Sequence, residues 1–110
     1  MAGADDLIRL ALNFPGAAQY PHFDRLAFKA RVTFATLAPD RLTANLKLEP
    51  DEQALKCEVA PDAFSPVPNA WGQRGWTVAK LSALTEKEVE AALALAYAHA
   101  ARKPKRKRPD

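Results

Sequence analysis

Hydrophobic and polar residues follow two different periods along this chain, and these periods predict helices and strands in a definite order. Between residues 4 and 14 apolar positions recur every three or four residues, which is the spacing of one helical face. Asp5 and Asp6 stand in the first turn, where carboxylates complement the helix dipole, and Pro15-Gly16 ends the pattern. An opening helix is therefore predicted.

The next part of the chain alternates with a period of two, which is typical of strands. Residues 17–25 are predicted to form a connection that covers the edge of a sheet. The strands that follow are predicted at residues 26–30, 32–37 and 42–48. The third is the clearest, because its apolar residues alternate with Thr, Asn and Lys, as expected for a sheet with one face in the core. Its apolar residues are Leu42, Ala44, Leu46 and Leu48.

A short helix is predicted after this meander. Pro50 suits the first turn of a helix over residues 51–59, in which Leu55 and Val59 supply a modest apolar stripe. Prolines then limit residues 63–67 to a short edge strand, because proline cannot donate to the ladder.

The last third of the chain combines a strand with a long helix. Residues 71–75 are predicted to form a tight connection into a strand over 76–81. Thr85 and Glu88 form a capping box, and the apolar stripe that follows predicts a helix as far as Arg102.

The predicted order is α-β-β-β-α-β-β-α, in which strands that follow one another are joined by short turns. This order indicates the α+β class, as a two-layer sandwich with an antiparallel sheet and its helices on one face. The other face is expected to stay open. The predicted organisation is one domain over residues 1–101 and a disordered basic tail over 102–110.

The net charge of +3 is unevenly distributed. Residues 102–110 hold six of the 16 basic and one of the 13 acidic residues, which leaves 10 basic and 12 acidic residues in the preceding part. Attraction to nucleic acid would therefore depend on the tail, or on cations gathered on one face of the fold.

Other features of the sequence indicate the cellular compartment of the protein. No apolar run is long enough to span a membrane, and no signal peptide is recognised at the N-terminus. The single cysteine, Cys57, cannot form an internal disulfide and is interpreted as a half-buried structural thiol. We expect a soluble protein of the cytoplasm that does not bind membranes.

Several short motifs stand in a specific order along residues 4–101. They are Phe14-Pro15-Gly16, Leu26-Ala27-Phe28-Lys29, Phe34-Ala35-Thr36-Leu37, Asn45-Leu46-Lys47-Leu48 before Pro50-Asp51-Glu52, Trp71-Gly72 and Gly75-Trp76-Thr77-Val78. In this order they resemble the MmcQ/YjbR family of small bacterial proteins, which is described as having a double-wing DNA-binding motif. The resemblance implies an α+β fold with a secretion-chaperone-like arrangement, a DNA-binding role and no enzymatic activity.

The candidate nucleic-acid-binding residues are cations of the predicted hairpins and of the tail. They are Lys29, Arg31 and Lys47 from the meander, Arg74 and Lys80 from the last hairpin, and Lys103, Lys105 and Arg106 from the tail. These side chains could straddle phosphates, and the alternative is that they are ordinary solvated charges.

The two tryptophans have two interpretations. Trp71 and Trp76 could stack on bases, but at least one is expected in the core, because a domain with few aromatic residues needs their area. His22 and His99 do not have the spacing of metal ligands, and no catalytic grouping is recognised, so no metal and no cofactor are predicted.

Three hypotheses follow for the function. The first is a non-enzymatic module that binds double-stranded DNA through the hairpin cations, with the tail adding affinity that does not depend on sequence. The second is an adaptor that offers the open sheet face or an edge strand to a protein partner. The third is a small-molecule or enzymatic site between the sheet and the 17–25 connection, around Tyr20, His22 and Arg25.

Overall fold

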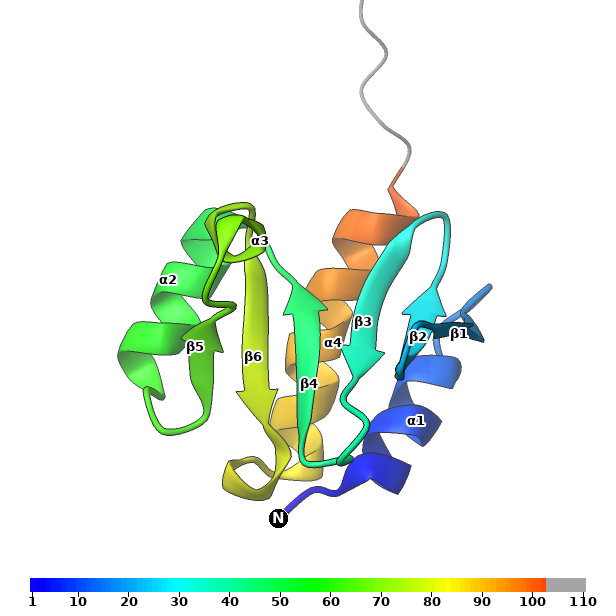
Figure 1. Ribbon diagram of the computed structural model, residues 1–110, viewed down its shortest axis with the longest axis horizontal. Coiled ribbons are helices and arrows are strands. Elements are labelled where there is room, and N and C mark those ends of the chain that lie inside the picture. The colour runs from blue at the N-terminus through cyan, green and yellow to red at the C-terminus, as the bar shows by residue number, and fades with distance from the viewer. Residues whose placement is uncertain (103–110) are drawn as a thin grey trace, which may run out of the picture.

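The computed structural model describes residues 1–102, which form an antiparallel sheet with the longer helices packed on one side (Figure 1). The strands are β1 (Ala18–His22), β2 (Arg25–Lys29), β3 (Thr33–Leu37), β4 (Thr43–Lys47), β5 (Phe64–Pro66) and β6 (Trp76–Lys80). The helices are α1 (Ala4–Leu12), α2 (Pro50–Val59), α3 (Ala70–Gln73), a 3-10 turn η1 (Leu81–Ala83) and α4 (Glu86–Ala101).

The strand order in the sheet is β1-β2-β3-β4-β6-β5, and every neighbouring pair is antiparallel. In Figure 1, α4 runs behind β3 and β4, and it packs against both strands and against α1. Helix α2 packs against the edge strand β5. The opposite face of the central strands carries no helix among residues 1–102, so the predicted two-layer α+β architecture is confirmed.

The prediction of a connection over residues 17–25 is wrong in one respect. Its middle part forms β1, which pairs with β2 so that Tyr20 lies opposite Ala27. No residue of β1 is fully buried, and only Tyr20 is partly buried. A strand that buries so little surface does not need alternating apolar residues, and for this reason the pattern gave no signal.

The core lies between the sheet and the helices α1 and α4. Phe28, Phe34 and Leu46 are fully buried there, together with Leu7 of α1 and Leu93 of α4. Burying a side chain of this size stabilises a fold by about 1.5–3 kcal/mol, so this cluster is the main source of stability.

The apolar face of the predicted third strand is found with one exception. Ala44, Leu46 and Leu48 are buried, but Leu42 is 64% exposed, because β4 begins only at Thr43 and Leu42 belongs to the preceding turn. The predicted apolar stripe of the second helix is also wrong. Leu55 and Val59 are exposed, since α2 packs on a sheet edge and buries no residue completely.

In strand β6 the smaller side chains face the core and the larger ones face the open side, which is the reverse of what residue size suggests. Thr77 and Ala79 are buried on the helix side, whereas Trp76 and Val78 lie on the open side and are only partly buried. The Thr77 hydroxyl donates a hydrogen bond of 2.9 Å to the Gly75 carbonyl, which removes the cost of burying it.

The helix termini follow the predicted electrostatics. At the start of α4 the Glu88 backbone N–H donates to Thr85 Oγ1 at 3.1 Å, and the Thr85 N–H donates to Glu88 Oε1 at 2.9 Å, so the capping box is confirmed.

Near the other end of α4, Arg102 donates to Glu49 Oε1 at 3.1 Å, and the His99 ring nitrogen lies 3.1 Å from the same oxygen. These contacts lower the pKa of Glu49, with Arg102 as the main cause.

Two glycines allow the segment before β6 to approach its neighbours closely. A Cβ at Gly72 would lie 1.9 Å from the Val67 carbonyl oxygen, and a Cβ at Gly75 would lie 1.9 Å from that of Leu48. Gly75 also has a φ of +106°, which L-residues rarely adopt. Gly16 has a positive φ as well, but no atom lies near its would-be Cβ.

We predict that Gly75→Ala destabilises the protein by at least about 1 kcal/mol more than Gly16→Ala, because only Gly75 adds a steric clash to the strain of a positive φ. Urea unfolding followed by circular dichroism measures both. Equal costs would show that the close approach to Leu48 relaxes freely.

A second prediction concerns the carboxylate that joins α2 to α4. Arg102→Gln is expected to raise the pKa of Glu49 toward its ordinary value, because it removes the largest cause of the lowering. A pH titration of side-chain carboxyl signals by NMR measures this shift. Arg41→Gln, which disrupts a separate pair with Asp5, is the matched control and should leave the pKa of Glu49 unchanged.

The sign of the linked stability follows from the direction of that shift. A lowered pKa means that ionised Glu49 stabilises the fold above its unfolded-state pKa, and that this contribution is lost as pH falls through the folded-state pKa. In Arg102→Gln the free energy of unfolding should therefore decrease less steeply as the pH is lowered. An unchanged pKa of Glu49 in this variant would contradict the assigned role of Arg102.

Candidate functional site

A hollow forms on the open face of the sheet because small side chains occupy the middle of one row. The strand registers align Tyr20, Ala27, Thr36, Asn45 and Val78 across five strands. Residues that pair across strands share a face, so these side chains lie on the open side. Ala27 and Thr36 are short and buried, whereas larger side chains stand on both flanks. The surface is therefore lowest over β2 and β3.

This hollow is a groove of about 410 Å³, which we call the open-face groove. One wall comes from β1, and the other comes from β6 and from the segment that includes α3. The lining residues are Tyr20, His22, Arg25, Thr33, Thr36, Asn45, Val67, Asn69, Trp71 and Trp76. Its volume lies in the roughly 300–1,000 Å³ range of small-molecule sites.

The charged group in the groove is the guanidinium of Arg25. Its Nε donates a hydrogen bond of 2.8 Å to Thr36 Oγ1. Burial lowers the pKa of Arg25, and the charges of Asp24 and Asp40 act in the opposite direction. Among residues 1–102 no carboxylate lies within ion-pair distance of this guanidinium, so its charge is not neutralised directly.

Aromatic side chains supply most of the remaining lining. The Tyr20 hydroxyl forms a hydrogen bond with the Thr33 hydroxyl, which holds its ring over the sheet. Trp71 is 56% exposed and Trp76 is partly buried, so the prediction that at least one tryptophan lies in the core is wrong. The helix side of the sheet is filled by the phenylalanine and leucine cluster, and both indoles lie on the open side.

Helix α3 is held in place by a side chain that the sequence did not single out. The Gln53 amide nitrogen of α2 donates to the carbonyls of Gly72 at 2.9 Å and of Trp76 at 3.0 Å. The Asn69 side chain accepts from the Trp71 backbone N–H at 2.8 Å. These contacts fix the wall that carries Trp71. A lone glutamine in an exposed helical pattern gives no signal of such a role.

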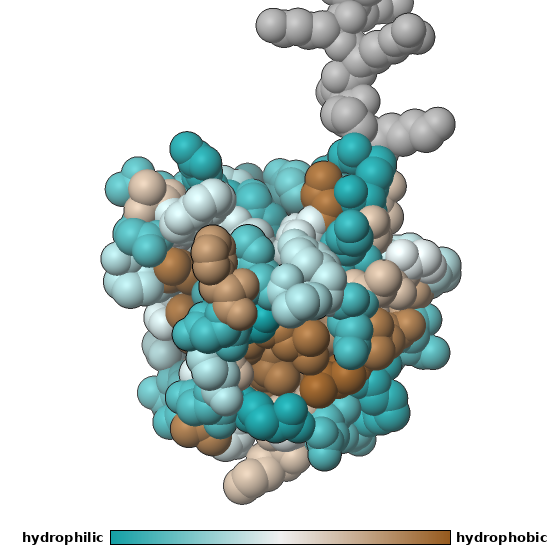
Figure 2. All heavy atoms as spheres, turned by 45° about the vertical axis from the view of Figure 1, so that its right-hand side comes forward, coloured by the Kyte–Doolittle hydropathy of each residue, from teal (hydrophilic) through white to brown (hydrophobic). Residues whose placement is uncertain are grey.

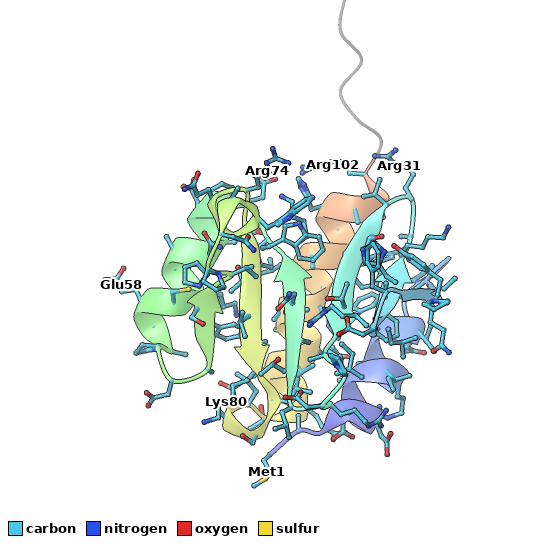
Figure 3. All side chains as sticks on the ribbon, viewed as in Figure 1. Met1, Arg31, Glu58, Arg74, Lys80 and Arg102 are labelled. Atoms are coloured by element: carbon cyan, nitrogen blue, oxygen red, sulfur yellow. The ribbon has the colours of Figure 1, made fainter. Side chains whose placement is uncertain are left out.

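The predicted DNA-contacting cations do not all lie together. Lys29, Arg31, Lys47 and Arg74 belong to one end of the sheet, to which Arg102 also contributes, and we call these five residues the cationic end. Figure 3 shows Arg74, Arg102 and Arg31 along this end of the molecule. Arg31 Nε donates to the Arg102 carbonyl at 3.2 Å, and Lys47 Nζ donates to the Arg74 carbonyl.

Lys80 lies apart from this group. It stands at the opposite end of β6 from Trp76, which places it more than roughly 13 Å along the strand from Arg74. Lys80 and Arg74 therefore do not form one wing, because α3 intervenes and β5 and β6 are not joined by a tight turn. The candidate residues Lys103, Lys105 and Arg106, with the rest of the predicted tail beyond Arg102, lie outside the described residues.

Cations and aromatic rings are paired at the border between the two regions. The Lys29 ammonium lies 5.3 Å from the centroid of the Tyr20 ring, and the Arg74 guanidinium lies 5.4 Å from that of the Trp71 ring. Both distances permit cation–π attraction. Each wall of the groove therefore carries a cation beside an aromatic ring, Lys29 beside Tyr20 and Arg74 beside Trp71.

The other candidate chemistry is sparse. Cys57 is partly buried beside the core, and burial raises its pKa, as expected for a structural thiol. Residues 1–102 contain no group of three His, Cys, Asp or Glu side chains arranged to hold a metal ion. In the same part of the chain, no helix combines the length and the apolar character needed to cross a bilayer.

Comparisons with known proteins agree with this fold. The structure is similar to the crystal structure of the Deinococcus radiodurans protein DR2400, which has a DUF419 domain, with a TM-score of 0.78 at 19% identity. The match covers 97% of this chain and 84% of the other. A search among curated proteins found no match.

The sequence itself matches a family model. The model described as YjbR matches residues 12–99, which extend from the end of α1 almost to the end of α4. The matched part includes the whole sheet, and with it the open-face groove. The chain therefore belongs to the YjbR family.

Proposed function

We propose that this YjbR-family domain is a non-enzymatic module that binds double-stranded DNA through its cationic end. The observation that carries the proposal is the gathering of Lys29, Arg31, Lys47 and Arg74 at one end of the sheet. In the described part of the chain none of the four forms an ion pair with a carboxylate. Unneutralised cations on one surface are the usual electrostatic basis for binding phosphates.

The charge balance of the chain supports the importance of this placement. Residues 1–101 contain more acidic than basic residues, so the composition of the domain does not by itself favour DNA. Elsewhere two arginines are neutralised, since Arg9 pairs with Asp6 and Glu86, and Arg41 pairs with Asp5. Lys29, Arg31, Lys47 and Arg74 have no such partner within residues 1–102 and lie at one end of the sheet, which makes this end the candidate for phosphate contacts.

The contacts would be mainly to the DNA backbone. Arg31 lies in the β2–β3 turn and Arg74 at the end of α3, so two separate loops present guanidinium groups. Two such loops suit phosphates on either side of a groove, which positions a protein without reading the sequence. The proposal gives no catalytic role to His22 or His99, and action on DNA would place the protein in the cytoplasm.

A second function, adaptor for a protein partner, is favoured by two observations. Phe23, in the turn between β1 and β2, is 94% exposed and has a φ of 57°. Figure 2 also shows apolar surface gathered in one patch, with hydrophilic residues around it. An exposed aromatic residue on a turn is a common anchor in protein interfaces.

Strand addition is a less suitable mode for such an adaptor. Both edge strands contain a proline, Pro21 in β1 and Pro66 in β5. A proline lacks the N–H that a new neighbouring strand would need, and natural sheets use it to block their edges. A partner would therefore dock on the open face or at Phe23.

The DNA proposal is tested by fluorescence anisotropy with a labelled duplex at two salt concentrations. We predict that the triple variant of Lys29, Arg31 and Arg74, each changed to Gln, loses most of its affinity. Its log–log salt slope should be shallower by about 0.9 for each phosphate contact removed. Lys80→Gln is the matched control, and it should bind like the unchanged protein because Lys80 lies at the other end of β6.

A truncated chain of residues 1–102 separates the domain from the segment that follows it. We expect this chain to retain measurable binding with a salt-dependent slope. Binding only by the full chain, or equal losses for the triple variant and Lys80→Gln, would refute a DNA surface on the domain. Binding of a protein partner that is lost in Phe23→Ala would then support the adaptor function.

A further inference from the structure

We propose that the open-face groove binds a small molecule in which a planar aromatic ring carries an oxyanion, either a carboxylate or a phosphate. This site is separate from the proposed DNA surface. It depends on Arg25, Trp71 and Trp76, and not on Arg31. Three features support it: an anchored cation, aromatic walls and a fixed shape.

Arg25 supplies the binding point for the oxyanion. Its Nε is engaged by Thr36 Oγ1 at 2.8 Å, so the guanidinium is held in one orientation on the floor of the groove. A contact from Nη2 to the Thr36 carbonyl is long, at 3.5 Å, and leaves most of the Nη donors available. A partly buried guanidinium without a bound carboxylate is suited to accept an oxyanion through two parallel hydrogen bonds.

The aromatic walls favour a planar ring next to that oxyanion. Trp76 and Tyr20 face the groove from β6 and β1, and Trp71 extends the wall from α3. The walls stand on β1 and β6, and β2, β3 and β4 lie between them, so the two wall strands are four strand spacings or roughly 19 Å apart. A planar ring with a charged substituent fits between walls at this spacing and stacks on one of them, and flat stacking on an indole contributes about 1–3 kcal/mol.

Polar groups at the floor and rim would orient such a ligand. The Asn45 side chain lines the floor beside Thr36 and forms no hydrogen bond within residues 1–102, so it remains available to a ring substituent. His22 stands on the β1 wall near Arg25, which pairs with it across the strands. A few such polar groups in a largely apolar groove are typical of small-molecule sites.

The groove does not need to form when the ligand arrives. Gln53 fixes the wall that carries Trp71 through two hydrogen bonds, and Gly72 packs directly on the Val67 carbonyl. The Arg25 side chain is fixed by Thr36. A site that is already ordered loses little conformational entropy on binding, which increases affinity for a small ligand.

Intrinsic fluorescence gives a direct test, because Trp71 and Trp76 are the two tryptophans of the chain. The full chain is titrated with adenosine 5′-monophosphate, phenyl phosphate and 4-hydroxybenzoate, and separately with adenosine and inorganic phosphate. We expect at least one aromatic anion to change the emission with a Kd below about 1 mM. The matched neutral or non-aromatic compound should bind at least about tenfold more weakly.

Three variants locate the binding. Arg25→Gln and Trp71→Ala should each lower the affinity for the aromatic anion by about tenfold or more. Arg31→Gln should leave this affinity unchanged. Trp71 is exposed, so its replacement keeps the test valid even if Arg25→Gln proves to be poorly folded. In Trp71→Ala the binding is followed by Trp76 emission and by isothermal titration calorimetry.

The results of these titrations identify the class of ligand, and they test the groove separately from the DNA surface. Preference for adenosine monophosphate indicates a nucleotide, and preference for 4-hydroxybenzoate indicates an aromatic carboxylate. The proposal is overturned if no aromatic anion binds at about 10 mM, if inorganic phosphate binds equally well, or if Arg31→Gln weakens binding as much as Arg25→Gln. Because Arg31→Gln should weaken DNA binding alone, either proposal can fail while the other stands.

Discussion

The close backbone contacts of Gly72 and Gly75 determine the form of the whole open side of this domain. They place α3 against the Val67 and Leu48 carbonyls, which leaves room for no side chain at either position. Through this packing, a segment more than 40 residues after β1 becomes the second wall of the groove. The same packing sets the position of Arg74 beside the other cations.

Elements that bury one face of a helix or strand were predictable from the sequence. The apolar stripe of α4 and the alternation in β4 both reflect contact with one core, and the capping box at Thr85 marks the start of α4 locally. Strand β1 was not predictable, because an edge strand that buries only part of Tyr20 has no need of apolar alternation. Backbone pairing with β2 and the polar contacts of Tyr20 hold it, and hydrophobic periodicity reports neither.

The site was predictable only in pieces. Tyr20, His22 and Arg25 were recognised as one cluster because they are close in sequence, and the structure adds Trp71 and Trp76 across the groove. At least one tryptophan was expected in the core because of its size. The β4–β6 register overrides size here, since it pairs Trp76 with Lys47 on the open face and turns Thr77 inward. Register depends on long-range pairing, which local patterns do not contain.

The attachment of Arg102 has a consequence for the residues that follow it. Arg102 is fixed by the Glu49 carboxylate and by Arg31, so residues 103–110, with five of the basic residues of the chain, are covalently joined to the domain at its cationic end. For any polyanion held there, contact with this segment becomes an intramolecular event, governed by an effective concentration rather than by the bulk one. Two weak contacts would then combine into a much higher overall affinity, and the position of the attachment would determine how large this gain is.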